Sequence, residues 1–124
     1  PASISQKAAV EALRGGQDSV DRMLMEYRRR RSTALNLLRS IPGVHCHEPQ
    51  GAFYLYPDIS AHLGKNGVKT PAQFAEQLLE RYRVAVVPGE AFGTGRHIRV
   101  TFAVSEQELE KGVARIAEFV AGLK

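Results

Sequence analysis

A long apolar stripe near the N-terminus limits the folds open to this chain. Its members recur at steps of three and four residues: Val20, Met23, Leu24, Tyr27, Ala34, Leu35, Leu38 and Ile41. Because this spacing marks one face of an α-helix, we expect a helix from about Asp18 to Ser40. At 1.5 Å per residue such a helix spans about 33 Å, which is long enough to bridge two domains.

Three further helices are indicated by their first residues. Ser3 with Gln6, Thr70 with Gln73, and Ser105 with Glu108 match the capping box, in which two side chains satisfy the free backbone donors of a first turn. We expect helices at about 3–14, at 71–82 and from 105 to near the C-terminus. The apolar residues expected to be buried are Phe74, Leu78 and Leu79 on the second, and Leu109, Val113, Ile116 and Val120 on the third.

Segments rich in β-branched and aromatic residues lie between the helices. Residues 44–47 and 52–56 flank a Pro/Gly turn at 48–51, which predicts a hairpin. Residues 84–87 and 97–103 predict two further strands, the second with clean apolar/polar alternation. This order favours an α/β fold, namely a small mixed β-sheet of about three to four strands that helices cover on one face and the long helix precedes.

The composition excludes several classes of protein. No apolar run approaches the roughly 20 residues of a membrane span. The single cysteine, Cys46, excludes an internal disulfide, so we expect a cytoplasmic protein without a membrane partner. The net charge of +4 could indicate a nucleic-acid partner. Most of the excess lies at Arg28 to Arg31, however, and so local a run is typical of the solvated face of a helix.

The chain contains no self-contained catalytic signature such as a P-loop, G-x-S-x-G or CxxC. His45 and His47 could contribute to a zinc site, but no further ligands stand at a usual spacing, so we expect no metal. The segment 89–95 holds three glycines, which allow close approach to a ligand. A strand follows it where a phosphate-binding loop would continue into a helix, so taken alone it is a connecting loop.

Arg99 is the most informative residue on physical grounds. In the predicted strand it lies on the face opposite Ile98, Val100 and Phe102. An arginine at this position is either exposed to solvent or meets a carboxylate or phosphate across that face. The planar fork of its guanidinium suits bidentate recognition of a carboxylate. The alternation alone leaves both interpretations open.

Four segments carry motifs in a fixed order: Tyr27 to Arg31, Pro49-Gln50-Gly51-Ala52-Phe53-Tyr54, Val84 to Gly89 followed by Phe92-Gly93, and His97 to Ala103. Each resembles a segment of the class I/II aminotransferases of the aspartate aminotransferase type. The corresponding family patterns are "Y/F-R-x-R-R" on the linking helix, "P-x-G-A-F-Y", "V-x-V-x-P-G-x-x-F-G" and "x-x-x-R-[ILV]-[SC]-[FY]-A". The similarity covers almost the whole chain.

The resemblance implies the C-terminal small domain of a fold type I enzyme that depends on pyridoxal phosphate. Residues 1–17 would be a helix that normally belongs to the large domain, and residues 18–124 the small domain with its linking helix. In this family the position of Arg99 binds the α-carboxylate of the substrate. Phe53, Phe92 and Gly93 are expected near the mouth of the active site. No nucleic-acid partner is expected, because the basic run becomes a surface feature of the linking helix.

The lysine that holds the cofactor in this family has no counterpart here. It lies in a serine-rich segment upstream of the position that matches Pro1, whereas this chain has Lys7, Lys65, Lys69, Lys111 and Lys124 in other contexts. We therefore expect an inactive fragment with no catalytic residue of its own and no bound pyridoxal phosphate. Its full-length parent, expected to be a homodimer, would use that cofactor to move an amino group between an α-amino acid and a 2-oxo acid. Two alternatives remain: a stand-alone, non-catalytic binding or regulatory module, and a parent that is a lyase or synthase using the same cofactor.

Overall fold

The computed structural model describes residues 2–123 of the chain. Its elements, in order, are α1 (Ser3–Arg14), α2 (Asp18–Arg39), β1 (Tyr54–Leu55), the 3-10 turn η1 (Ser60–His62), α3 (Pro71–Tyr82), β2 (Val87–Pro88), the 3-10 turn η2 (Gly89–Phe92), β3 (Ile98–Thr101) and α4 (Glu106–Gly122). Pro1 and Lys124, the outer bounds of the two expected segments, lie outside the described residues. The division into 1–17 and 18–124 stays a prediction.

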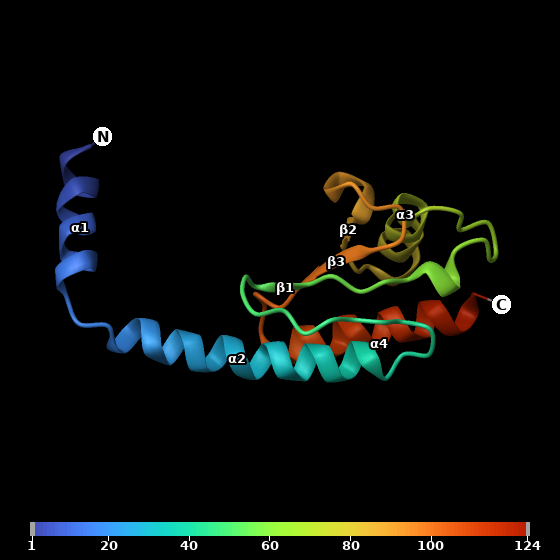
Figure 1. Cartoon of the computed structure of the whole chain (residues 1–124), viewed down its shortest axis with the longest axis horizontal. Helices are drawn as coiled ribbons and strands as arrows, with labels where there is room; N and C mark the ends of the chain where they lie inside the picture. The colour runs from blue at the N-terminus through green and yellow to red at the C-terminus, as the bar shows by residue number, and fades with distance from the viewer. Residues whose placement is uncertain (1, 124) are drawn as a thin grey trace.

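α2 begins outside the packed body of the molecule and ends inside it (Figure 1). Its C-terminal half buries Ala34, Leu35 and Leu38. The first part of the expected stripe is exposed instead, including Met23 and Leu24. α1 stands away from the body at the far end of α2 and buries none of its residues. The apolar stripe is therefore continuous in sequence but covered over only about half of its length.

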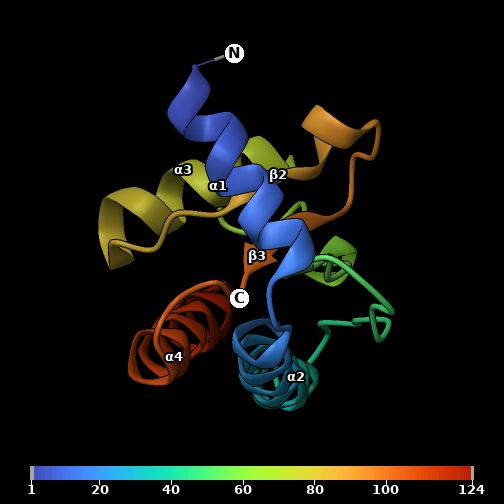
Figure 2. The same ribbon diagram turned by 90° about the vertical axis from the view of Figure 1, so that its left-hand side faces the viewer.

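The sheet has three strands in the order β1-β3-β2. Both pairings are antiparallel, with Leu55 opposite Val100 and Val87 opposite Arg99. The expected α/β class and the small helix-covered sheet are confirmed, but the prediction that the sheet is mixed was wrong. α2 and α4 lie side by side beneath one face of the sheet (Figure 2), while α3 packs beside β2 and against α4.

The core lies between the sheet and the helices. β3 contributes Ile98 and Val100, and Phe102 follows directly after its end; all three are buried as the alternation predicts. The four predicted residues of α4 are buried as well. On α3, Phe74 and Leu78 are buried and Phe74 meets Phe119 of α4 at 4.8 Å between ring centroids, but Leu79 is exposed. Leu79 is the residue after Leu78 and lies outside the buried face of α3, so the prediction that it is buried was wrong.

Two of the three expected N-cap residues start their helices. The hydroxyl oxygen of Thr70 accepts a hydrogen bond from the backbone N–H of Gln73 at 3.2 Å, and that of Ser105 accepts one from Glu108 at 3.3 Å. The expected cap at Ser3 was wrong. Ser3 is already the first helical residue of α1, and Ala2 precedes it without a side-chain cap. Within residues 2–123, no helix is both long enough and apolar enough to cross a membrane.

The predicted hairpin of residues 44–47 with 52–56 does not form. His45 pairs with Asp58 in an isolated antiparallel bridge, and β1 pairs with β3 instead. Side chains of α2 bind the carbonyl oxygens of the intervening segment: Arg39 binds Cys46 and Arg31 binds Pro49, both at 2.9 Å. Since helix side chains satisfy these carbonyls, the segment needs no strand partner there.

Candidate functional site

Arg99 lies within β3, on the face of the strand opposite the buried Ile98 and Val100. Its neighbours Ile98 and Val100 point into the core, so the alternation of the strand directs Arg99 out of it. The guanidinium forms no ion pair or side-chain hydrogen bond with any of residues 2–123. This positive charge is thus left uncompensated on a partly exposed surface.

Aromatic rings surround Arg99. The guanidinium carbon lies 5.0 Å from the ring centroid of Phe92 and 5.3 Å from that of Tyr54. With Tyr56 these residues line a hollow of about 290 Å³. Tyr54 and Tyr56 come from β1 and the residues just after it, and Phe92 from η2. The hollow therefore joins one cationic group to three aromatic walls, which suits a small ligand with an anionic end and an apolar body.

The loop between β2 and β3 is fixed by a network around Tyr56. Its ring stacks on His97 at 4.7 Å with an interplanar angle of 6°. Its hydroxyl lies 2.6 Å from Oγ1 of Thr94 and 3.3 Å from the carbonyl oxygen of Gly89. Nδ1 of His97 lies 3.2 Å from the same Thr94 oxygen. These contacts connect β1, the start of β3 and the loop that carries Phe92.

Asp58 places an acidic group close to His97 of this network. Its carboxylate lies 3.3 Å from Nε of Arg96 and 4.0 Å from Nε2 of His97. Partial burial pushes the pKa of Asp58 upward, but hydrogen bonds from Ser60 and the nearby positive charges hold it below its ordinary value. Asp58 therefore stays ionised near neutral pH and pairs with the loop rather than with Arg99.

The other expected residues of the active-site mouth take different positions. Phe92 lines the hollow and is 46% exposed. Phe53 is 58% exposed and meets Tyr54 edge-on at 6.4 Å, one ring away from the hollow. Gly93 ends η2 with φ +78°, a conformation that favours glycine, and so supports the turn that presents Phe92. Direct contact of these residues with a substrate stays a prediction.

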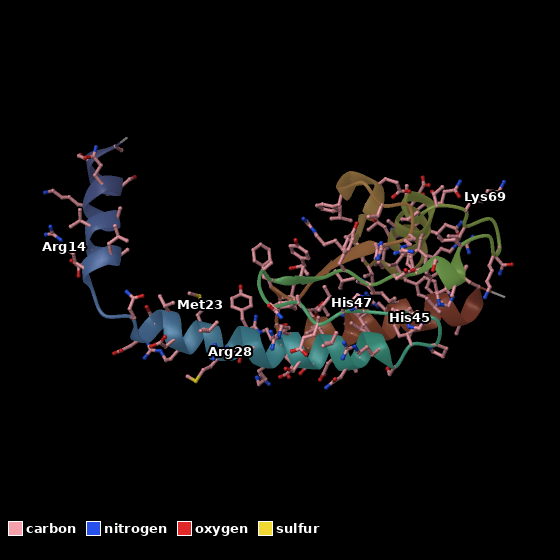
Figure 3. All side chains as sticks on the ribbon, viewed as in Figure 1. Arg14, Met23, Arg28, His45, His47 and Lys69 are labelled. Atoms are coloured by element: carbon pink, nitrogen blue, oxygen red, sulfur yellow. The ribbon has the colours of Figure 1, made fainter. Side chains whose placement is uncertain are left out.

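Lysines lie away from this hollow. Lys111 on α4 pairs with Glu108 at 3.6 Å, and Lys7 is on α1. Lys69 lies near the end of the molecule opposite α1 (Figure 3), in the same loop as Lys65. Lys124 is outside the described residues. None of the described lysines lines the hollow beside Arg99, so none of them lies where it could form an imine with a carbonyl group bound there, and the absence of pyridoxal phosphate from this chain stays a prediction.

His45 and His47 lie on the segment that follows α2 (Figure 3) and both are exposed. Among the residues that the structure describes, no cluster of three or more His, Cys, Asp or Glu side chains could hold a metal ion. Cys46 between them is buried, and this burial raises the pKa of its thiol. Neither histidine is among the residues that line the hollow beside Arg99.

Three residues of the site were not predicted as site residues from the sequence: Tyr54, Tyr56 and His97. Alternation around the buried Leu55 could have placed both tyrosines on the face of Arg99, provided that the pairing of β1 with β3 was known. His97 follows from the same rule, two residues before Arg99. The missing information was the strand pairing, which the predicted hairpin assigned wrongly.

Known proteins similar to this chain are aminotransferases. The family described as aminotransferase class I and II matches residues 2–116. The aspartate/prephenate aminotransferase of Cereibacter sphaeroides is 41% identical over 99% of this chain and 32% of its own length. The aspartate aminotransferase of Bacillus sp. (strain YM-2) is 42% identical over 97% of this chain and 31% of its own length. This chain thus spans about a third of the length of these relatives.

Solved structures give the same result. The crystal structure of the aspartate aminotransferase from Rhizobium meliloti matches with a TM-score of 0.95 and 41% identity, over 100% of this chain and 32% of that one. The aromatic aminotransferase from Pyrococcus horikoshii matches with a TM-score of 0.84 and 34% identity, over 94% and 31% of the two chains. These matches support neither a stand-alone binding module nor a lyase or synthase.

Proposed function

Because this chain belongs to the class I and II aminotransferase family, we propose that it is the C-terminal third of an aminotransferase and supplies the arginine that binds the substrate α-carboxylate. In this proposal the full-length enzyme transfers an amino group between an α-amino acid and a 2-oxo acid. Similarity to aspartate and aspartate/prephenate aminotransferases favours an acidic amino acid as one substrate. A homodimer of the full-length enzyme is part of the same proposal.

The observation that carries the proposal is that Arg99, in its aromatic hollow, pairs with no acidic side chain among residues 2–123. An arginine that no acid neutralises keeps its planar fork of N–H donors available for the two oxygens of a carboxylate. Every α-amino acid and 2-oxo acid carries such a carboxylate, so one arginine serves both halves of the reaction.

The family implies pyridoxal phosphate, which supplies the chemistry at the amino group when bound. In the proposal the cofactor is held by the two thirds of the enzyme that this chain does not span. The contribution of this chain is positioning. Arg99 binds the carboxylate at one end of the substrate and thereby orients the Cα–H bond for cleavage.

A chimera provides the test. The preceding two thirds of the Rhizobium meliloti aspartate aminotransferase are joined to this chain, and amino-group transfer from an amino acid to a 2-oxo acid is followed. We expect a chimera that retains pyridoxal phosphate and is active, and an Arg99→Ala chimera that retains the cofactor but loses most activity. The 124-residue chain alone should retain no stoichiometric cofactor after the excess is removed. Cofactor held at one lysine of this chain, or full activity of Arg99→Ala, would refute the proposal.

A further inference from the structure

The position of the Arg99 side chain depends on aromatic rings rather than on an acidic partner. Strand pairing fixes only its backbone, opposite Val87 of β2. Its guanidinium forms no ion pair within residues 2–123, and it lies over the rings of Phe92 and Tyr54. A cation is attracted to the face of an aromatic ring. Ring contacts therefore orient the guanidinium and leave its N–H donors unoccupied.

The Phe92 ring is itself held in place by Tyr56. The two rings meet edge-on at 5.8 Å with an interplanar angle of 85°. Tyr56 is fixed by its stack on His97 and by the contacts of its hydroxyl with Thr94 and Gly89. The hydroxyl contacts reach both ends of the η2 turn, since Gly89 opens the turn and Thr94 follows its last residues. Tyr56 thus connects β1 to the turn that carries Phe92.

These rings contribute little to the core of the fold. Phe92 is exposed to nearly half of its surface, and Tyr54 is only partly buried. Substitution of such exposed residues usually changes stability little, whereas substitution of a buried ring such as Phe74 or Phe119 is strongly destabilising. An effect of Phe92 or Tyr54 on function would therefore be separable from an effect on folding.

We propose that Phe92 and Tyr54 are positioning residues for Arg99. Tyr56 acts on Arg99 indirectly, because it anchors the η2 turn that carries Phe92. The proposal rests on the proposed role of Arg99 in binding a carboxylate. Before the substrate arrives, the two rings hold the guanidinium in one orientation, with its fork toward the hollow. This lowers the conformational entropy that carboxylate binding would otherwise cost.

The test uses the active chimera or full-length enzyme with Phe92→Leu, Phe92→Tyr, Tyr54→Leu and Tyr56→Phe. Substitution by Leu keeps the apolar bulk but removes the ring. Phe92→Tyr keeps a ring and should therefore retain activity. Each variant is assayed with an amino acid and with the amine that lacks only its α-carboxylate. Urea unfolding checks that the variants are folded. If one of the two Leu variants does not fold, the other is sufficient for the test.

We expect Phe92→Leu to lower kcat/KM for the amino acid about 3- to 30-fold, mainly through a higher KM, as the loss of a cation–π contact predicts. The value for the amine should stay within about twofold. Phe92→Tyr should stay within about twofold of the parent for both substrates. Tyr56→Phe keeps the ring stack but loses the hydroxyl contacts, and should lower kcat/KM for the amino acid about 2- to 5-fold.

A double-mutant cycle with Arg99→Ala separates this inference from the proposed function. Once Arg99 is absent, Phe92→Leu should have no further effect on kcat/KM. An equal additional loss in that background, an equal loss for the amine, or no loss in either Leu variant would overturn the positioning role while leaving the role of Arg99 intact. If Arg99→Ala itself leaves kcat/KM for the amino acid unchanged, the proposed function fails and this inference fails with it.

Discussion

Arg31 on α2 donates a hydrogen bond from Nη1 to the carbonyl oxygen of Pro49, at 2.9 Å. Its Nη2 also lies 3.0 Å from the carboxylate of Glu48. About two turns nearer the C-terminal end of the helix, Arg39 donates a hydrogen bond to the carbonyl oxygen of Cys46. The segment that leads from α2 to β1 is therefore fixed to the helix by arginine side chains, and its course determines where Tyr54 enters the sheet.

The contact of Arg31 with Pro49 should contribute measurably to stability. Arg31→Ala removes a charge-assisted hydrogen bond to a carbonyl, so we expect the free energy of unfolding to fall by about 1–2 kcal/mol. Arg28→Ala is the matched control on the same helix, because Arg28 is exposed and its side chain has no polar partner within residues 2–123. It should change stability by less than about 0.5 kcal/mol. Urea unfolding measures the free energy of unfolding of both variants. An equal decrease in the two would show that the contact of Arg31 with Pro49 is not stabilising.

Two glycines of the loop before β3 should differ in how much a substitution by alanine destabilises the protein. A Cβ on Gly89 would lie 2.5 Å from the carbonyl oxygen of His97 and 2.7 Å from Oγ1 of Thr94, so the loop must shift. A Cβ on Gly95 meets no atom within 4 Å. We expect Gly89→Ala to destabilise by about 2 kcal/mol or more, and Gly95→Ala by less than about 0.5 kcal/mol. Thermal unfolding measures both, and a Gly89→Ala protein as stable as Gly95→Ala would contradict the close packing.

Sequence patterns predicted the parts of this molecule that depend on local chemistry. The bounds of α3 and the burial of alternate β3 residues follow from a capping box and from strand alternation. The pairing of β1 with β3 could not be predicted, because the carbonyls around Pro49 are bound by arginines that lie many residues earlier in the chain. The aromatic hollow depends on that pairing. The outward position of Arg99 was therefore predicted, but the presence of Tyr54 and Tyr56 beside it was not.

α1 should be the least stable helix of the chain on its own. It buries no residue, and its apolar side chains Ile4, Val10 and Leu13 are exposed, the last to 85%. Without a surface to cover them, the helix gains little from packing and should open readily. Amide hydrogen exchange should show weak protection at residues 3–14 and strong protection at β3. Equal protection of both segments in a demonstrated monomer would contradict this expectation.

His62 should make stability depend on pH. It is only 6% exposed, and burial lowers the pKa of its imidazole below the ordinary value of 6.5. The unfolded chain therefore takes up the proton first as the pH falls. The contribution of neutral His62 to the free energy of unfolding is complete above pH 6.5 and is lost progressively below it. Urea unfolding at pH 7.5 and 5.5 should show a larger decrease for the parent than for His62→Gln, and equal decreases would assign the effect to other groups.

The sharpest prediction concerns Arg99→Lys in the active chimera or full-length enzyme. Lysine keeps the positive charge but offers a point contact in place of the planar fork, so bidentate binding of a carboxylate is lost. The side chain points away from the core, so the fold should be preserved and cofactor retention should stay near normal. Loss of such a pair costs about 2–5 kcal/mol, which is roughly a 30- to several thousand-fold decrease in kcat/KM.

The decrease should appear for every α-amino acid and 2-oxo acid and should shrink for amines that lack the α-carboxylate, because only the former present two oxygens to the guanidinium. Arg81→Lys provides the control, since Arg81 is an exposed arginine of α3 that does not line the hollow around Arg99. It should leave kcat/KM within about twofold. Steady-state kinetics with an amino acid and its decarboxylated amine give the comparison. An equal loss for both substrates would mean that Arg99 acts on something other than the carboxylate.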